Sequence, residues 1–167
     1  MTMETKPASE DRKVVKTLPP LFGLSKREID AIEVLGFELY QQGRMQEAGA
    51  IFEGLIGVND QMYHGYAGKG AIALAEEKLD EAVDWLTQAL ERNADDPTVH
   101  ANLGEALLRL GRFDEAAAEF EKTLMLDPQQ KDPGANRARA ILAGMHAMIE
   151  ERQKNRRDGA TVRKEFR

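Results

Sequence analysis

Residues 35–48 read Leu-Gly-Phe-Glu-Leu-Tyr-Gln-Gln-Gly-Arg-Met-Gln-Glu-Ala, and residues 103–116 read Leu-Gly-Glu-Ala-Leu-Leu-Arg-Leu-Gly-Arg-Phe-Asp-Glu-Ala. Both stretches keep a leucine–glycine pair, a second glycine and a final alanine in one register, two steps of 34 residues apart. A fixed 34-residue period is typical of stacked helix-turn-helix units. The repeat therefore predicts an all-α chain and favours a binding surface over a catalytic centre.

The same 34-residue period holds for the residues between the two stretches and for residues beyond their ends. Small residues recur where two helices of a hairpin would cross, and large apolar residues recur beside them to fill the remaining space. The recurring sets are Gly36, Gly70 and Gly104; Ala48, Ala82 and Ala116; Phe52, Leu86 and Phe120; and Met45, Leu79 and Phe113. One hairpin cannot bury its apolar faces alone, so each is expected to stack on the next.

Composition and charge narrow the class of protein. The 167 residues are 42% apolar and 31% charged, the balance of a water-soluble helical protein. The chain has no cysteine, no secretory leader pattern and no apolar run of bilayer length, which favours a cytoplasmic protein without stable membrane insertion. The net charge is −6, with acidic residues in excess before residue 131 and basic residues in excess after it. An acidic body disfavours nucleic acid as the main partner.

Capping signals divide the chain into predicted segments. Ser25 and Glu28 form a capping box before a helix over 26–42 that ends at Gly43, and Asp96-Pro97 opens the third pair of helices. A disordered arm over 1–17 precedes a repeat domain over 18–157, and 158–167 would be a basic flexible tail. The predicted repeats are 29–62, 63–96 and 97–130; their further helices are 45–58, 61–76, 79–92, 97–110 and 113–126, and a capping helix spans 132–157.

Three details of packing are predicted as well. Residues 18–24 form an apolar clip that could pack on a second copy of the chain, so a homodimer is possible. Interior glycines 65, 68 and 70 predict that the first helix of repeat two is the loosest. The capping helix would turn its apolar stripe inward, and that stripe consists of Ile141, Leu142, Met145, Met148 and Ile149.

The side chains that catalysis needs are scarce. The only serines are Ser9 and Ser25, and the three histidines, His64, His100 and His146, are not at metal-ligand spacing. We predict no catalytic residue, no metal and no cofactor, with His100 packed as a structural histidine. An accessory domain of a catalytic assembly remains an alternative.

The pattern Leu35-Gly36, Gly43, Ala48 and Phe52, with its second copy ending at Pro128, resembles tetratricopeptide repeats. The resemblance implies an all-α helical-hairpin solenoid of three repeats with an N-terminal capping segment and a C-terminal capping helix. The stretches 35–52, 63–71 and 100–111 are further similar to the three repeats of class II chaperones of bacterial type III secretion. That similarity implies a cytoplasmic, non-enzymatic chaperone that holds a hydrophobic translocator before export.

The family places its peptide-binding groove on the first helix of each repeat. The matching groove residues in this chain are Phe37, Tyr40, Gln41, His64, Ala67, Ala71, Leu74, Ala101, Asn102, Glu105 and Leu108. The implied partner is a protein client with an extended apolar segment. The chain lacks the Lys/Asn/Arg set with which some tetratricopeptide proteins clamp a C-terminal carboxylate, because Glu33 and Phe37 occupy two of those positions. A scaffold that assembles a signalling or secretion complex is the alternative function, and the basic tail could meet nucleic acid, an anionic membrane or only solvent.

Overall fold

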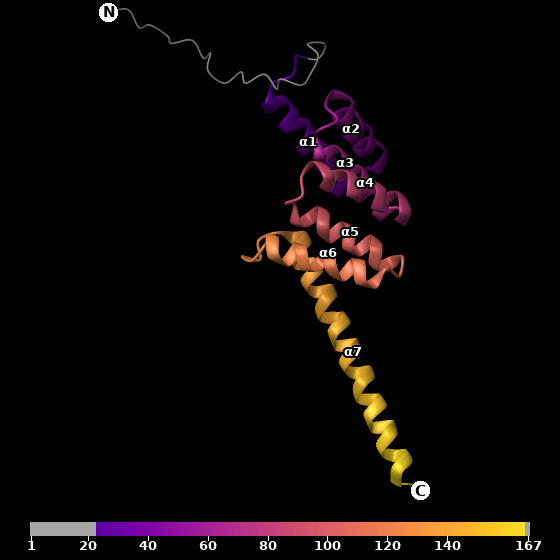
Figure 1. The fold of residues 1–167 in the computed structure, drawn as a ribbon. Helices are drawn as coiled ribbons and strands as arrows, with labels where there is room; N and C mark the ends of the chain where they lie inside the picture. Colours follow the sequence, from indigo (N-terminus) through magenta and orange to yellow (C-terminus); the bar gives the residue numbers. More distant parts are fainter. Residues whose placement is uncertain (1–22, 166–167) are drawn as a thin grey trace, which may run out of the picture. The chain divides into compact units, whose positions relative to one another are not determined.

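The computed structural model describes residues 23–165, without the side chains of residues 149, 152–153 and 155–165. The predicted arm over 1–17 and most of the apolar clip lie outside this part. The chain forms two compact units, Met1–Ala94 and Asp95–Arg167. Every regular element in residues 23–165 is a helix, which confirms the all-α prediction. The elements, labelled in Figure 1, are α1 (Lys26–Gln41), α2 (Met45–Val58), α3 (Tyr63–Ala75), α4 (Leu79–Arg92), α5 (Pro97–Arg109), α6 (Phe113–Leu126) and α7 (Pro133–Glu165).

Local signals set the boundaries of these helices. Ser25 accepts a hydrogen bond from the Glu28 backbone N–H while the Glu28 carboxylate accepts one from the Ser25 backbone, so the predicted capping box is present. Asp96 caps α5 through the backbone N–H of Val99. Gly43 ends the α1–α2 turn with φ +76°, a conformation that glycine adopts without strain.

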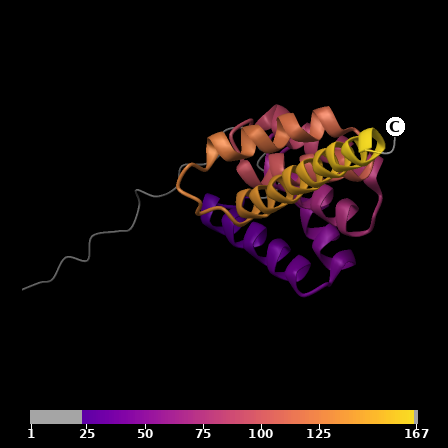
Figure 2. The ribbon, with the colours of Figure 1, turned by 90° about the horizontal axis from the view of Figure 1, so that it is seen from below.

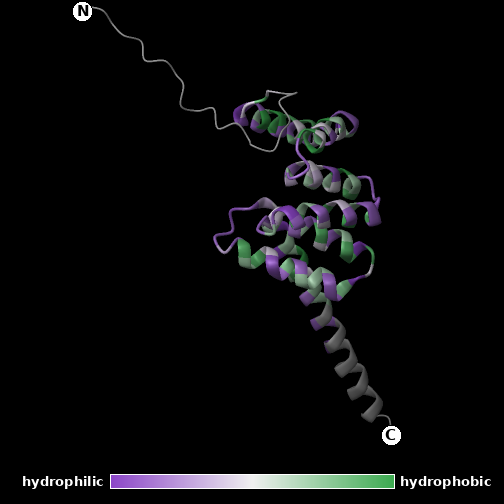
Figure 3. Ribbon diagram, turned by 45° about the horizontal axis from the view of Figure 1, so that its top comes forward, coloured by the Kyte–Doolittle hydropathy of each residue, from purple (hydrophilic) through white to green (hydrophobic). Residues whose placement is uncertain are grey.

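In the first unit, α1 pairs with α2 and α3 pairs with α4, and α2 packs against α3. In the second unit, α5 pairs with α6 and both contact α7. These helices mix polar and apolar residues, as Figure 3 shows, so each has a face to bury and a face for solvent. Helical hairpins of this kind repeat every 34 residues, in agreement with the period of the sequence.

The recurring residues form the centre of each hairpin. Phe52, Leu86 and Phe120 are fully buried, as are the three recurring alanines. A Cβ atom built on Gly36, Gly70 or Gly104 would lie 2.6–2.8 Å from the large side chain of its own hairpin. Only glycine permits this approach at the helix crossing, which explains why the glycine, the alanine and the large residue recur together.

Two packing predictions need correction. Phe113 is 60% exposed, whereas its counterparts Met45 and Leu79 are half-buried. Met148 is 72% exposed and does not join an inner stripe, because α7 makes its closest contact through the fully buried Ala135 and Ala138 near its start.

The end of α7 also differs from the prediction. The helix continues to Glu165, eight residues beyond the expected end at 157. Figures 1 and 2 show it as one continuous helix, and in Figure 1 it extends beyond α5 and α6. The residues after 157 include no proline, and Gly159 lies within the helix rather than at its end.

The glycines of α3 have a packing role that the prediction of looseness overlooked. A Cβ on Gly68 would lie 2.4–2.5 Å from three ring atoms of Phe52, and one on Gly65 would lie 2.7 Å from Ile56. These glycines therefore let α3 approach α2 closely. The dense packing opposes the intrinsic free-energy cost of glycine in a helix.

Candidate binding surface

The predicted groove residues of the first unit come from α1 and α3, which contact each other. On α1, Phe37 and Tyr40 are half-buried against the core cluster that contains Phe52, and Gln41 is exposed. The rings of Phe37 and Phe52 meet edge to face with their centroids 5.0 Å apart, a favourable aromatic geometry. The core cluster thus holds Phe37 and Tyr40 in place on one side, while part of each side chain remains accessible.

The α3 residues of this set differ in accessibility. Ala67, Ala71 and Leu74 are buried, each only 7% exposed, so they offer little surface to a partner. His64 is half-buried, and its Nδ1 atom lies 3.0 Å from Oε1 of Glu33 on α1. The accessible members of the predicted set in the first unit are therefore Phe37, Tyr40, Gln41 and His64, and His64 is paired with Glu33.

In the second unit, the predicted residues lie on α5. Ala101 and Asn102 are buried, whereas Glu105 and Leu108 are half-buried. Arg137 of α7 donates to the side-chain oxygen of Asn102, and its Nε lies 3.2 Å from Oε2 of Glu105. Arg109 donates to the other Glu105 oxygen over 2.6 Å. The predicted groove residues of α5 therefore lie beside a charged, hydrogen-bonded row formed by Arg109, Glu105 and Arg137.

Two partners of the predicted residues were missed, Glu33 as the partner of His64 and Arg137 as the partner of Asn102 and Glu105. Repeat counting alone would not have found Arg137, because the 34-residue step relates it to Leu103, a buried residue outside the predicted groove set.

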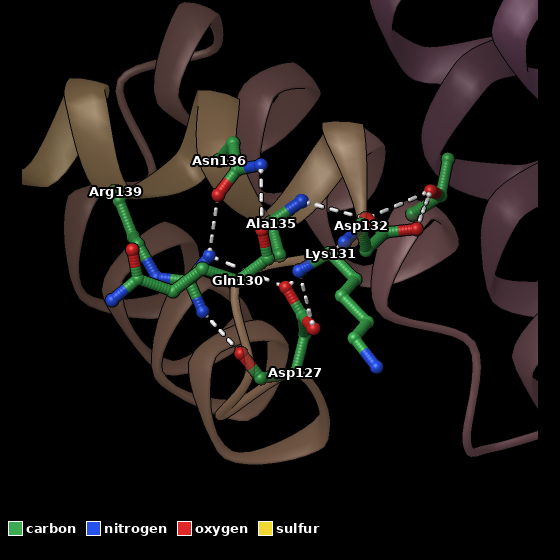
Figure 4. A network of polar contacts seen from close by, with 8 residues as sticks. Asp127, Gln130, Lys131, Asp132, Ala135, Asn136 and Arg139 are labelled. Atoms are coloured by element: carbon green, nitrogen blue, oxygen red, sulfur yellow. Dashed lines mark hydrogen bonds and ion pairs between the residues drawn. The ribbon is translucent and has the colours of Figure 1, made fainter.

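A polar network at the α6–α7 turn joins the end of α6 to the start of α7 (Figure 4). The Asp127 carboxylate accepts from the backbone N–H groups of Lys131 and Asp132 over 3.0 and 3.1 Å and pairs with Arg139 over 3.3 Å. Arg139 also donates to the backbone oxygen of Asp127, and Asn136 donates to that of Gln130. Burial alone would raise the pKa of Asp127, but the two backbone donors and Arg139 outweigh it and hold the pKa below its usual value.

His100 is packed as predicted. It is buried, and its Nδ1 lies 2.5 Å from Oε2 of Glu119, which also binds Lys122 over 2.8 Å. Burial would raise the pKa of Glu119, but the bonds from His100 and Lys122 lower it. This pair ties α5 to α6, which is a structural role.

Among residues 23–165, no three His, Cys, Asp or Glu side chains converge as metal ligands would. Nor does any helix there combine the length and apolar character that crossing a bilayer requires.

Comparison with known proteins places these hairpins in a family context. Residues 73–142 match the family model described as "Tetratricopeptide repeat". The bovine (Bos taurus) protein "DnaJ homolog subfamily C member 3" is 28% identical over 98 residues, which are 59% of this chain. The chain spans only 19% of the length of that relative.

Solved structures give longer matches. PcrH of Pseudomonas aeruginosa, crystallised with the chaperone binding region of PopD, is 26% identical and has a TM-score of 0.65 over 77% of this chain and 98% of that chain. Its complex with the corresponding region of PopB is also 26% identical, with a TM-score of 0.61 over 71% and 97%. The "Type III Secretion Translocator Chaperone SycD" of Yersinia enterocolitica, at 21% identity and a TM-score of 0.64 over 77% and 97%, shares the fold.

Proposed function

We propose that this tetratricopeptide-repeat protein, which resembles translocator chaperones of type III secretion, is a non-enzymatic chaperone that holds an apolar segment of an export-bound client. The fold similarity to PcrH and SycD supports a peptide-binding chaperone. A cytoplasmic location, a translocator-like client and self-association belong to this proposal.

The observation that carries the proposal is the accessible aromatic pair Phe37 and Tyr40 on α1. Both rings rest on the core cluster around Phe52, so their positions are fixed before a client arrives. Fixed aromatic side chains bind apolar groups at a low cost in conformational entropy. An extended client segment would place an apolar side chain against these rings and its backbone beside Gln41.

The buried residues of α3 have a supporting role in this proposal. Ala67, Ala71 and Leu74 shape the surface under the client rather than contact it over a large area. The charged row of Arg109, Glu105 and Arg137 in the second unit is a separate polar contact for a client that carries polar residues at that point.

The test is capture of the client by the full-length chain from its native host, with identification by mass spectrometry. Tyr40→Glu should lose most of the captured client, because a charge would replace an apolar contact. Ala50→Glu, which adds the same charge at an exposed position of α2, is the matched control and should keep the client. Equal capture by both variants, with unchanged helicity, would refute the binding surface; capture of signalling components in place of an apolar exported protein would favour the scaffold.

A further inference from the structure

The outer face of α1 carries an apolar patch that no described residue covers. Ala31, Val34 and Leu35 lie at i, i+3 and i+4, so their side chains are neighbours on one face of the helix. Val34 is 57% exposed and Leu35 is 45% exposed, and Ala31 is exposed as well. These three residues are called the α1 patch below.

The repeat itself indicates what this face is for. One period later, the same three positions are Gly65, Gly68 and Lys69 of α3. There the face lies directly on α2, with the two glycines against Ile56 and Phe52. In repeat two, this face of the first helix is therefore covered by α2, the helix that precedes it in the chain.

The segment that precedes α1 is apolar and short. Residues 18–22 read Leu-Pro-Pro-Leu-Phe, and the described chain starts immediately after them at Gly23. Gly23 has φ +50°, a left-handed conformation that reverses chain direction at low cost only for glycine. Leu24 then packs against the core cluster that contains Ile29. The chain thus enters α1 through a left-handed Gly23 and a packed Leu24, with the apolar segment just before them.

The lengths agree with a return path along α1. A helix rises 1.5 Å per residue, so Val34 and Leu35 lie about 14 Å from Ser25 along the helix axis. An extended chain covers about 3.3 Å per residue, so the five residues before Gly23 reach about 16 Å. Leu18 can therefore reach Val34 and Leu35, with Leu21 closer to Ala31.

The two prolines suit this position. They favour a polyproline II conformation with three residues per turn, which places Leu18 and Leu21 on one side about 9 Å apart. Proline has no backbone N–H to leave unsatisfied on an apolar surface, and its restricted backbone lowers the entropy lost on docking. We infer that residues 18–22 fold back from Gly23 and cover the α1 patch of their own chain, in place of the helix that precedes α3. A second copy of the chain on the same patch is the competing occupant.

The absence of cysteine from the chain makes a direct test possible. The full-length double variant Leu18→Cys/Leu35→Cys should form a disulfide within one chain under mild oxidation at low micromolar concentration. The matched control Leu18→Cys/Ala50→Cys carries its second thiol on the exposed face of α2 and should not crosslink. Crosslinks between two chains, or equal crosslinking in both variants, would overturn the inference.

A second experiment leaves the α1 patch intact. Leu18→Ser/Leu21→Ser in the full-length chain should speed amide exchange of α1 by about three- to tenfold, because partial burial of two leucines is lost. Exchange in α5 and α6 is the internal control, and the sedimentation behaviour across a dilution series should not change. Unaltered exchange in α1 contradicts the inference, and a variant that turns a dimer into a monomer assigns the patch to a second copy instead.

Discussion

α3 and α7 both cover the hairpin that precedes them, but they do so by different physical means. α3 lies on α2 through glycines pressed against Phe52 and Ile56, an apolar contact that depends on shape. α7 contacts α5 and α6 through Ala135 and Ala138 and is then held by the ionised Asp127 and its donors. The first contact should respond to side-chain volume, and the second should respond to pH.

The largest effect is expected at Phe52 of α2, because both α1 and α3 pack against its side chain. Phe52 is fully buried between Gly36, Phe37 and Gly68. Phe52→Ala should lower the free energy of unfolding by about 3–5 kcal/mol, because it removes the ring and leaves a cavity. Denaturant unfolding followed by the fluorescence of Trp85, the only tryptophan, measures this change in the first unit. The same substitution at the exposed Phe113 is the control; because Phe113 lies in the second unit, both variants are also followed by far-UV circular dichroism, and this one should change the unfolding free energy by no more than about 0.5 kcal/mol.

A smaller loss is expected when volume is added to the α2–α3 contact. Gly68→Ala would place a Cβ 2.4–2.5 Å from the Phe52 ring and should cost about 1–3 kcal/mol, since the ring has no free space to move into. At Gly54 of α2 no atom lies within 4 Å of an added Cβ. Gly54→Ala should therefore stabilise the same unit by up to about 1 kcal/mol, because alanine favours helix. If both substitutions stabilise the protein, the close-contact role of Gly68 is wrong.

The α7 contact should instead weaken in acid. Because the pKa of Asp127 is lowered in the folded state, its carboxylate stabilises the fold above the usual aspartate value of about 3.9, and that stabilisation is lost as pH falls through the folded pKa. Asp127→Asn should weaken the start of α7 at neutral pH and remove part of its acid dependence. Hydrogen exchange of residues 133–139 at several pH values, corrected for intrinsic rates, measures this. If the exchange rates of the variant depend on pH as those of the parent protein do, Asp127 does not contribute to the pH dependence of this contact.

The smallest effect concerns the turn within the second hairpin. Glu77 has φ +60° at the position where the other hairpins have Gly43 and Gly111 with φ of +76° and +77°. Glu77→Gly should remove backbone strain from the folded state, but it also increases the conformational entropy of the unfolded chain. The first effect should be the larger, so the free energy of unfolding should rise by up to about 1 kcal/mol. A loss of stability in the Trp85 unfolding curve would show that the Glu77 side chain contributes more than its backbone costs.

Much of the fold could be predicted because the signals were local and repeated. The capping box at Ser25, Asp96-Pro97 and the turn glycines fix helix boundaries through nearby hydrogen bonds and backbone sterics, and these boundaries agree with the sequence to within about two residues. The end of α7 could not be predicted in this way, because Gly159, the stop signal that would match the other turn glycines, lies within the helix. The exposure of Phe113 and Met148 also depends on which neighbouring helices exist, and periodicity alone does not contain that information.

The candidate surface was harder to predict than the fold. The residues were placed by repeat position, which says which side of a helix they occupy but not how much of each remains accessible. Leu74 is buried where a client contact was expected, and Arg137 brings charge to Asn102 and Glu105. Both outcomes depend on side chains from other helices, so they follow from the tertiary packing and not from the position of a residue in the repeat. The role of the predicted residues in binding stays a prediction.

The fit of Gly68 to Phe52 restricts how such a chain can evolve by duplicating or exchanging its modules. At the corresponding position, repeat one has Val34 and repeat three has Asn102. Either module, if copied into second place, would drive a branched or amide side chain into the ring of Phe52. The order of these modules is therefore restricted by this steric pairing and by that of Gly65 with Ile56, and a viable rearrangement would need smaller side chains on α2 at the same time.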